Sequence, residues 1–315
     1  MSSTLLAIAL RTLRAAVTLL LGVTVVFVVL RAAGDPVEQL LPRETPPAVR
    51  DEYRALWGLD RPIPVQYVAW LGRMAEGDFG RSFADGAPAF EAVVEAVPRT
   101  LLLGGAALAL ALFAGLTIGL AAALRHGTAV DRTLMGGAVL GYSMPVFFLG
   151  ILLILFFVLQ LRLLPSSGAS TWAHLILPAA TLALPLTGRI ARFARTAMLE
   201  VMGRPFVRTA RAKGLGRIAV IVGHALPNAA IPLLMFLGIE VGLTLSGAVV
   251  TETIFAWPGL GRLLVDSVAA RDLPVVQAVI LTVTAIIVLS NLVVDVLHAL
   301  VDPKVDLART LGSGR

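Results

Sequence analysis

The sequence predicts an all-α integral membrane protein with six transmembrane helices, and three observations lead to this fold class. Hydrophobic residues make up 57% of the 315 residues, whereas a typical soluble domain has about 45–50%. Charged residues make up only 15% and gather between apolar segments, and the mean hydropathy is +0.87. Six apolar segments are long enough to cross a hydrocarbon layer of about 30 Å, which takes about 20 residues of helix.

The predicted spans cover residues 13–30, 100–124, 134–161, 175–194, 229–250 and 275–300. If the N-terminus is cytoplasmic, the inner loops carry Arg125, Arg132, the cluster between Arg189 and Arg217, and Lys304. The outer loops between the later spans hold few basic residues. This asymmetry follows the positive-inside rule, so we expect both termini in the cytoplasm.

The first apolar segment has a second interpretation, because small residues that suit a signal peptidase follow it at 32–34. Its apolar run of about 16 residues is longer than most signal-peptide cores. We therefore favour a retained span. In the second span, Gly115 and Gly119 lie four residues apart and are expected to allow close helix packing.

The chain divides into three predicted parts. Residues 1–31 form an N-terminal tail and the first span, residues 32–96 an extracytoplasmic segment, and residues 97–315 a five-helix core with a cytoplasmic loop at about 195–227. The extracytoplasmic segment holds eleven acidic residues and six Arg and is too long for a plain connector. Two roles remain open for it, a cap on the membrane surface or a dock for an extracytoplasmic partner.

Within this segment, Pro62 and Pro64 are expected to start a short helix. One face of that helix would carry apolar and aromatic side chains that suit a membrane interface. The residues expected on this face are Trp57, Tyr67, Val68 and Leu71.

Several functional classes are disfavoured by composition. The formal net charge is +6, but the basic residues lie in loops without interleaved aromatics, so we expect no nucleic-acid partner. The chain contains no cysteine, which excludes disulfides and thiolate metal sites. Its histidines lack the spacing of metal ligands, and we expect no metal site. They are His126, His174, His224 and His298.

The segment between Glu200 and Pro227 is strongly basic and separates two apolar segments. We expect a helix over residues 200–214, because Glu200 complements the positive end of a helix dipole and Gly214 suits a helix stop. We expect a basic helix in this place to lie in the cytoplasm. From the residues alone, one role open to it is attachment to anionic lipid at the membrane surface.

Polar residues inside the later spans are candidates for the transport pathway or its gate. Glu240 lies midway along the fifth span, and a carboxyl group at that depth is costly unless it faces a cavity or a partner. Its alternatives are a neutral packing group or a contact with another subunit. The further candidates are Thr244, Ser246, Glu252 and Trp257.

Two polar residues of the sixth span, Asn291 and Asp295, lie one helical turn apart and share a face. We expect hydrogen bonds between helices from this pair. For Trp257, an anchoring role at the membrane interface is the alternative to a gate.

The basic loop resembles the signature loop of permease subunits of bacterial ABC importers, which has Glu-Ala-Ala, three residues, Gly, nine residues, Ile, one residue and Leu-Pro. Four positions match, namely Ala210, Gly214, Leu226 and Pro227. Arg208, Thr209 and His224 depart from this pattern. The departures, in FVRTARAKGLG and HALPNAAIPLL, resemble the variant seen in peptide and nickel permeases.

Similar stretches run along the whole chain. They are GDFGRSF at 77–83, VPRTLLLG at 97–104, SMPVFFLGILLILFF at 143–157, TETIFAWPGLGRLL at 251–264 and DPKVD at 302–306. Together they resemble the B-type permease subunit of the dipeptide, oligopeptide and nickel importers.

The resemblance implies a type I ABC-importer permease fold in the plasma membrane of a bacterium or archaeon. The implied partners are a homologous second permease, two cytoplasmic ATP-binding subunits, an extracytoplasmic substrate-binding protein and the lipid bilayer. This chain lacks G-x-x-x-x-G-K-[ST], so we expect no enzyme activity, and ATP and Mg²⁺ would bind to the partner subunits.

The loop is implied to contact the ATPase. The contact residues are expected to be Arg204, Phe206, Arg208, Thr209, Ala210, Lys213, Gly214 and Leu215, and the motif ends with His224, Leu226 and Pro227. We expect Gly214→Asp to leave the chain in the membrane but to uncouple ATP hydrolysis from transport.

The function implied is import of dipeptides or oligopeptides. Import of nickel, a nickel chelate or glutathione by the same kind of permease is the alternative. A more distant alternative is a proton-coupled secondary transporter that uses Glu240 and Asp295 as proton carriers. Such transporters usually contain internal repeats, and the two halves of this sequence show no convincing repeat.

Overall fold

The computed structural model describes residues 3–32, 34–35, 37–38, 41–42 and 44–301. Within these ranges the regular secondary structure is helical, apart from one isolated β-bridge between Arg81 and Pro88. The C-terminal stretch with DPKVD lies outside the described residues. The helices are α1 (Ser3–Ala32), α3 (Pro47–Leu56), α4 (Ile63–Ala75), α5 (Ala89–Leu124), α6 (Ala129–Ser143), α7 (Val146–Leu153), the π-helix η1 (Ile154–Gln160), α8 (Ala173–Met202), α9 (Pro205–Ala212), α10 (Arg217–Val220), the π-helix η2 (Ile221–Ala225), α11 (Leu226–Ile254), α12 (Leu260–Ala269) and α13 (Leu273–Val301).

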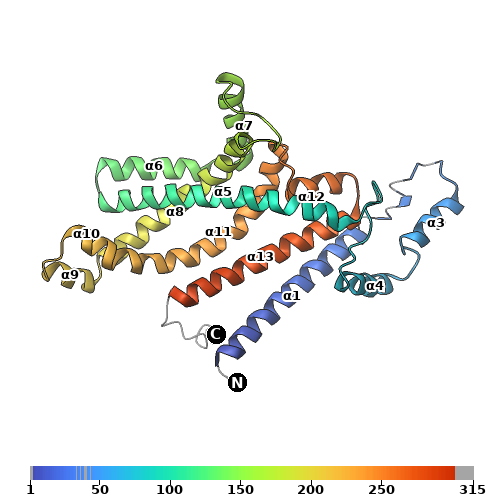
Figure 1. The fold of residues 1–315 in the computed structure, drawn as a ribbon, viewed down its shortest axis with the longest axis horizontal. Helices are drawn as coiled ribbons and strands as arrows, with labels where there is room; N and C mark the ends of the chain where they lie inside the picture. The colour runs from blue at the N-terminus through green and yellow to red at the C-terminus, as the bar shows by residue number, and fades with distance from the viewer. Residues whose placement is uncertain (1–2, 33, 36, 39–40, 43, 302–315) are drawn as a thin grey trace.

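The long helices α5, α8, α11 and α13 form the bundle, with α1 against α13 (Figure 1). Small residues bring α5 and α8 together. A Cβ at Gly119 would lie 2.5 Å from the carbonyl oxygen of Ala191, and one at Gly115 would lie 2.8 Å from Ile190. The close packing predicted for these two glycines is therefore confirmed.

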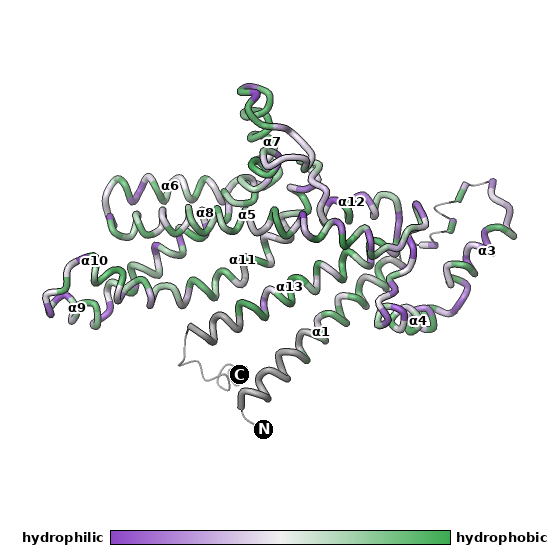
Figure 2. The backbone as a smooth tube through the Cα atoms, in the orientation of Figure 1, coloured by the Kyte–Doolittle hydropathy of each residue, from purple (hydrophilic) through white to green (hydrophobic). Residues whose placement is uncertain are grey.

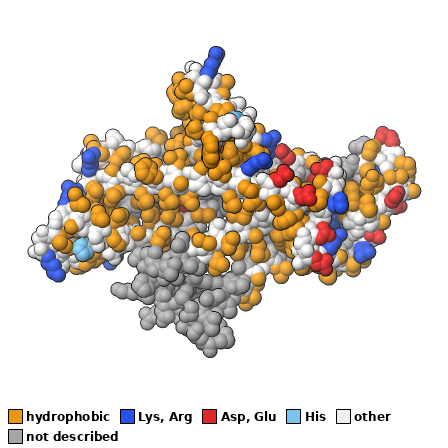
Figure 3. All heavy atoms as spheres, in the orientation of Figure 1, with side chains coloured by type: hydrophobic (Ala, Val, Ile, Leu, Met, Phe, Trp, Pro, Cys, Tyr) orange, Lys and Arg blue, Asp and Glu red, His pale blue; other side chains and the backbone are white. Residues whose placement is uncertain are grey.

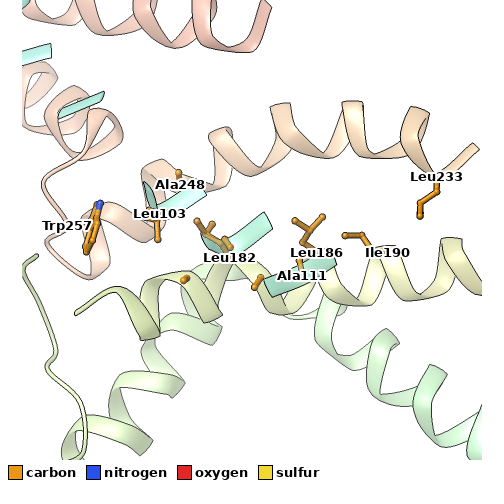
Figure 4. Packing of buried hydrophobic residues seen from close by; sticks show 11 residues of the cluster. Leu103, Ala111, Leu182, Leu186, Ile190, Leu233, Ala248 and Trp257 are labelled. Atoms are coloured by element: carbon orange, nitrogen blue, oxygen red, sulfur yellow. The ribbon is translucent and has the colours of Figure 1, made fainter. Parts of the chain in front are cut away.

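The main core lies between α5, α8 and α11, where α8 is buried along most of its length (Figure 4). Leu182, Leu186 and Ile190 of α8 follow one another along the face that meets the neighbouring helices. Leu103 of α5 and Trp257 extend the same cluster toward the end of α11. Burial of large aliphatic side chains here fixes the relative positions of the three helices.

Three described helices are long and apolar enough to cross a membrane, namely α5, α8 and α13 up to Val294. Two bent pairs of helices raise the number to five if each pair counts as one span. The described apolar part of α1, Ala16–Val29, is shorter than a full span. Figure 2 shows apolar stretches along the bundle and more polar ones around α9 and α3.

The third predicted span, 134–161, is wrong as a single straight helix. The structure breaks it after Ser143, and α6 meets α7 and η1 at an angle of 103°. The cause is local, because a residue before proline avoids the helical region. Met144 is extended, with ψ 134°, and Pro145 follows it with ψ 136°.

In the segment between α1 and α5, α4 packs against α1. Phe27 of α1 contacts Tyr67 and Trp70 of α4, and the hydroxyl groups of Thr24 and Tyr67 lie 2.6 Å apart. Leu71 joins this cluster. The expectation that Val68 and Trp57 share this face is wrong.

Val68 is 68% exposed, because it lies to the side of the face of α4 that packs on α1. Trp57 ends α3 and stacks on Phe83 at 4.1 Å. The loop around Phe83 is in turn tied to the turn between α12 and α13, since the backbone N–H of Phe83 and the hydroxyl of Ser82 both donate to Asp272.

Candidate functional site

The α8–α11 loop, residues 203–225, contains the short helix α9. Helix α8 ends at Met202, Arg204 is extended with ψ 149°, and Pro205 opens α9. The predicted single helix over 200–214 is therefore wrong at its start. Because Arg204 precedes a proline, it leaves the helical region, and Glu200 lies in the last turn of α8, where it pairs with Arg204 at 2.6 Å.

One face of α9 rests on its own chain. Val207 and Ala210 are buried against Val220 of α10, next to Val201 and Met202 at the end of α8. Ala210, one of the predicted contact residues, thus seats α9 on the protein. This small apolar seat fixes which side of α9 faces outward.

The other face of the loop is exposed and basic. Its charged side chains sit beside three exposed hydrophobic ones, so the surface combines positive charge with apolar area, as protein interfaces do. The exposed residues are Arg204, Phe206, Arg208, Thr209, Arg211, Lys213, Gly214, Leu215 and Ile218.

Gly214 ends α9 in the left-handed region, with φ +80°. Its N–H donates to the carbonyl of Arg211, and the N–H of Leu215 donates to that of Ala210. A Cβ at Gly214 would meet no atom within 4 Å. Substitution here is therefore opposed by backbone strain and not by a clash.

The end of the motif lies where the loop enters α11. His224, Leu226 and Pro227 are all exposed, and the carbonyl of His224 accepts a hydrogen bond of 2.7 Å from the Asn228 side chain. Arg217 connects the loop to α5 by donating to the carbonyl of Leu124 at 2.9 Å.

Glu240 is paired within the chain, with a partner that the sequence interpretation did not include. Arg189 of α8 donates to both of its carboxylate oxygens, at 2.7 to 3.0 Å. The Glu240 side chain is 2% exposed and that of Arg189 is 33% exposed. The pair connects α8 to α11, and only its arginine reaches the surface.

Of the two neighbouring candidates on α11, the structure describes the side chain of Thr244 but not that of Ser246. Thr244 is buried and donates to the carbonyl of Glu240 at 2.7 Å, so its own helix satisfies its hydroxyl. The Ser246 side chain lies outside the described part of the chain, as does that of Asp295. Asn291 is exposed on α13. The expected hydrogen bonds of Asn291 and Asp295 stay a prediction.

Glu252 and Trp257 form the turn from α11 to α12. The fully buried carboxylate of Glu252 accepts from the Thr100 hydroxyl at 2.7 Å, and from the N–H groups of Gly261 and Arg262 at 2.7 and 3.1 Å. Trp257 is also buried and donates from Nε1 to the carbonyl of Arg99 at 3.0 Å. Both side chains therefore lock this turn onto α5, and neither reaches an open passage in the isolated chain.

A third polar cluster was not predicted. Arg195 of α8 donates twice to Asp131, at 2.6 and 2.7 Å, and Asp131 also accepts from the N–H of Gly127. The cluster ties α8 to the turn between α5 and α6. Sequence reasoning assigned Arg189 and Arg195 to general positive charge on the inner side. The signal that could have revealed the pairs is that an acid in or near a span needs a cation on a neighbouring helix.

Among the described residues, no group of three or more His, Asp and Glu side chains is placed to hold a metal ion. The polar groups of the site instead form pairs between helices.

Comparison with known proteins identifies the family to which the chain belongs. The family described as the inner-membrane component of binding-protein-dependent transport systems matches residues 115–307. The N-terminal domain of such membrane components matches residues 5–104. Together the two matches extend from α1 beyond α13.

Curated relatives cover nearly all of the chain. A probable peptide ABC transporter permease, y4tP of Sinorhizobium fredii, is 37% identical over 92% of this chain and 95% of its own length. The glutathione transport system permease GsiC of Salmonella choleraesuis is 40% identical over 91% and 94%. The dipeptide transport system permease DppB of Escherichia coli K12 is 38% identical over 86% and 90%.

Solved structures show the same fold at lower identity. The inward-facing MetNI methionine ABC transporter aligns with a TM-score of 0.59 and 20% identity, over 68% of this chain and 98% of the solved one. An amino acid ABC transporter aligns with a TM-score of 0.53 and 19% identity, over 69% and 95%. On the strength of the family match and of these relatives, the chain belongs to the inner-membrane components of binding-protein-dependent transport systems, as an ABC-importer permease of the dipeptide and oligopeptide family.

Proposed function

We propose that this chain forms half of the membrane pathway of an ATP-driven importer of dipeptides or oligopeptides, which an extracytoplasmic binding protein delivers. The choice of peptide as cargo is supported by the sequence identity of 37 to 40% to relatives named for peptide, dipeptide and glutathione transport. Glutathione is itself a small peptide, so all three names describe related cargo.

The proposed topology has six spans, formed by α1, α5, α6 with the helices that follow it, α8, α11 and α13, with both termini in the cytoplasm. Support comes from the distribution of charge. Acidic side chains gather at the end of the molecule with α3 and α4, whereas the end with α9 is basic (Figure 3). Excess Lys and Arg marks the cytoplasmic side of a membrane protein.

The exposed face of α9 is the proposed dock for a cytoplasmic ATP-binding subunit. Two such subunits would serve the complex, one on this chain and one on the homologous second permease, and they would bind the ATP and Mg²⁺. The buried seat of Val207 and Ala210 supports this assignment, because it packs α9 against the end of α8 and fixes which face of α9 is exposed.

ATP binding would draw the two ATPases together and carry α9 with them. The pathway would switch from inward-facing to outward-facing and accept cargo from the binding protein, and hydrolysis would reset it. A mechanism of this kind needs two discrete states of the bundle and a rigid element that biases them. The pair between Arg189 and Glu240 suits that need, since it joins α8 to α11.

A transport assay tests the function. The complex of this chain with its co-expressed second permease, ATPases and binding protein is reconstituted in liposomes, and uptake of a labelled dipeptide and of labelled glutathione is measured with ATP and without it. We expect ATP-dependent uptake that requires the binding protein. Faster uptake of glutathione than of dipeptides would favour the second cargo. Uptake driven by a proton gradient in the absence of ATP would contradict the proposal.

A further inference from the structure

Three arginines follow one another along α8, namely Arg189, Arg192 and Arg195. Residues three apart in a helix are neighbours on its surface, so these side chains share one strip of α8. The strip lies between α6 and α11, because Arg195 reaches Asp131 of α6 and Arg189 reaches Glu240 of α11. The central residue, Arg192, is exposed.

The two outer arginines of this strip are neutralised within the chain. They donate hydrogen bonds of 2.6 to 3.0 Å to Glu240 and Asp131, whose side chains are 2% and 4% exposed. Arg192 differs, because it makes no ion pair with any described residue. One net positive charge therefore remains at the centre of the strip, and a charge within a membrane helix is costly unless it faces water or a partner.

The contacts of Arg192 within the described residues are with a neutral side chain, that of Tyr142 on α6. Its guanidinium carbon lies 5.1 Å from the centre of the Tyr142 ring, and Nη1 donates to the phenol oxygen at 3.3 Å. A guanidinium group held over a ring still presents N–H groups along its edge, and these match the two oxygens of a carboxylate. The phenol can donate its own hydrogen to the same anion. The pair therefore has the geometry of a carboxylate site.

The direction in which Arg192 extends separates a carboxylate of the cargo from a lipid headgroup. The ring of Tyr142 lies beside Gly188, since a Cβ there would be 3.3 Å from Cδ1 of the ring. Arg192 therefore extends about one turn toward the N-terminal end of α8, away from the α5–α6 turn that Arg195 contacts through Asp131. In the proposed topology that turn is cytoplasmic, and an arginine that binds headgroups extends toward the membrane surface. Arg192 extends in the opposite direction.

We propose that Arg192 and Tyr142 bind the terminal carboxylate of a peptide as it passes along this chain, an inference that rests on the proposed function. A peptide with an unmodified C-terminus carries this group whatever its side chains are, so one site of this kind serves cargo of varied sequence. The neutral contact with Tyr142 suits brief binding, because an arriving peptide has no counter-ion to displace from Arg192.

Photolabelling tests the site in the purified, nucleotide-free complex of this chain with the second permease and the ATPases. The probe is a dipeptide whose C-terminal residue is benzoylphenylalanine, used once with a free carboxylate and once as its C-terminal amide. Omitting the binding protein removes its own preference between the two. We expect the free acid to label α6 or α8 near Tyr142. We expect the amide to label this region about tenfold less, because it lacks the charge that Arg192 binds.

Substitutions separate carboxylate binding from a structural role. Arg192→Ala should reduce labelling by the free acid about tenfold and leave labelling by the amide unchanged, and Arg192→Lys should restore part of the loss. Arg132→Ala, a change at an exposed arginine of α6, is the matched control and should label as the wild type does. Equal loss of both labels in Arg192→Ala would show a structural role and contradict the site.

The wild-type complex alone can also overturn the site. Equal labelling by acid and amide would do so, as would adducts confined to other helices or absent from this chain. If Arg192→Ala loses the second permease but keeps the label, the arginine serves contact between subunits and the proposal fails. ATP-dependent uptake of the dipeptide into liposomes, measured with the binding protein, tests the proposed function independently. Uptake without selective labelling overturns the site alone, whereas absence of ATP-driven uptake overturns the function.

Discussion

The two ends of α11 are held in different ways. At its C-terminal end, the turn into α12 is fixed by one buried carboxylate, that of Glu252, which receives three hydrogen bonds. Thr100 of α5 also accepts from the N–H of Leu260, and Trp257 bonds to the carbonyl of Arg99. At its N-terminal end, α11 and the preceding η2 pack on α5 and α8 through apolar contacts, among them Ala225 and Ala229 against Met198. The exposed helix α9 before them rests on a small apolar seat.

This difference suggests how force enters the molecule. A turn that is locked to a neighbouring helix serves as a fixed point, whereas an exposed helix on a small apolar seat serves as a place to push. Between the two ends, Arg189 and Glu240 join α11 to α8, and Phe193 stacks on Phe236 with ring centroids 4.5 Å apart. In the proposed mechanism, α8 and α11 would act as one lever, fixed at the α12 end and driven at the α9 end.

The largest effect is expected from Arg189→Ala, which breaks the lever in the middle. The change leaves the buried carboxylate of Glu240 without its partner, and such a loss typically costs about 3–5 kcal/mol. Thermal unfolding of the purified complex measures the loss. The double variant Arg189→Ala/Glu240→Ala should recover much of it, because no unpaired charge remains. Wild-type stability in the single variant would contradict the role given to this pair.

The next largest effect is expected at the fixed end, from Glu252→Ala. Three donors lose their acceptor in a buried place, and we expect a loss of about 2–3 kcal/mol in the free energy of unfolding. Glu252→Gln keeps one carbonyl oxygen and should lose less. An alanine variant that unfolds at the wild-type temperature would show that the turn is not held by this carboxylate.

Gly261→Ala probes the same turn through packing. A Cβ there would run into the backbone of Val249, and forcing an extra methyl group into a packed site costs about 1–3 kcal/mol. Gly136→Ala on α6 is the matched control, because no atom lies within 4 Å of its added Cβ. The difference in unfolding temperature between the two variants measures how tightly the turn is packed. Equal unfolding temperatures would contradict the close packing of Gly261 on Val249.

The smallest effect on stability, but a large one on transport, is expected at the driven end. Gly214→Val forces a β-branched residue to φ +80°, at a local cost of about 1–2 kcal/mol. Valine is a sharper probe than aspartate here, since Asp and Asn tolerate this region. We expect the valine variant to reach the membrane and assemble, with ATP hydrolysis but little uptake, and Gly214→Asn to retain uptake. Normal uptake by the valine variant would contradict the proposal that α9 couples ATP hydrolysis to transport.

The sequence predicted the helical fold class and the left-handed stop at Gly214, because hydropathy and glycine position are local signals. It did not predict the sharp bend of the third span, although Pro145 was visible, since many membrane helices tolerate proline. The pairing of Glu252 with Thr100 joins residues 152 positions apart. Only the packing of α5 on the α11–α12 turn brings them together, and so Glu252 was interpreted as a gate.

A similar limit applies to the middle of α11. The sequence showed that a carboxyl group at Glu240 would be costly inside a span, but it did not show which residue pairs with it. Arg189 begins a run of basic residues that the positive-inside rule already explained. Likewise, Glu200 suited the start of a helix by its charge, whereas Pro205 places that start five residues later.

The most direct measurement of the central claim is whether α9 binds the ATPases. The chain is tagged, extracted gently with its partners and analysed by mass spectrometry, as wild type and as Arg208→Glu/Arg211→Glu. Both changes lie on the exposed face of α9, away from the seat. We predict that the double variant loses the ATP-binding subunits but keeps the second permease. Recovery of the ATPases with the double variant in wild-type amounts would contradict the account.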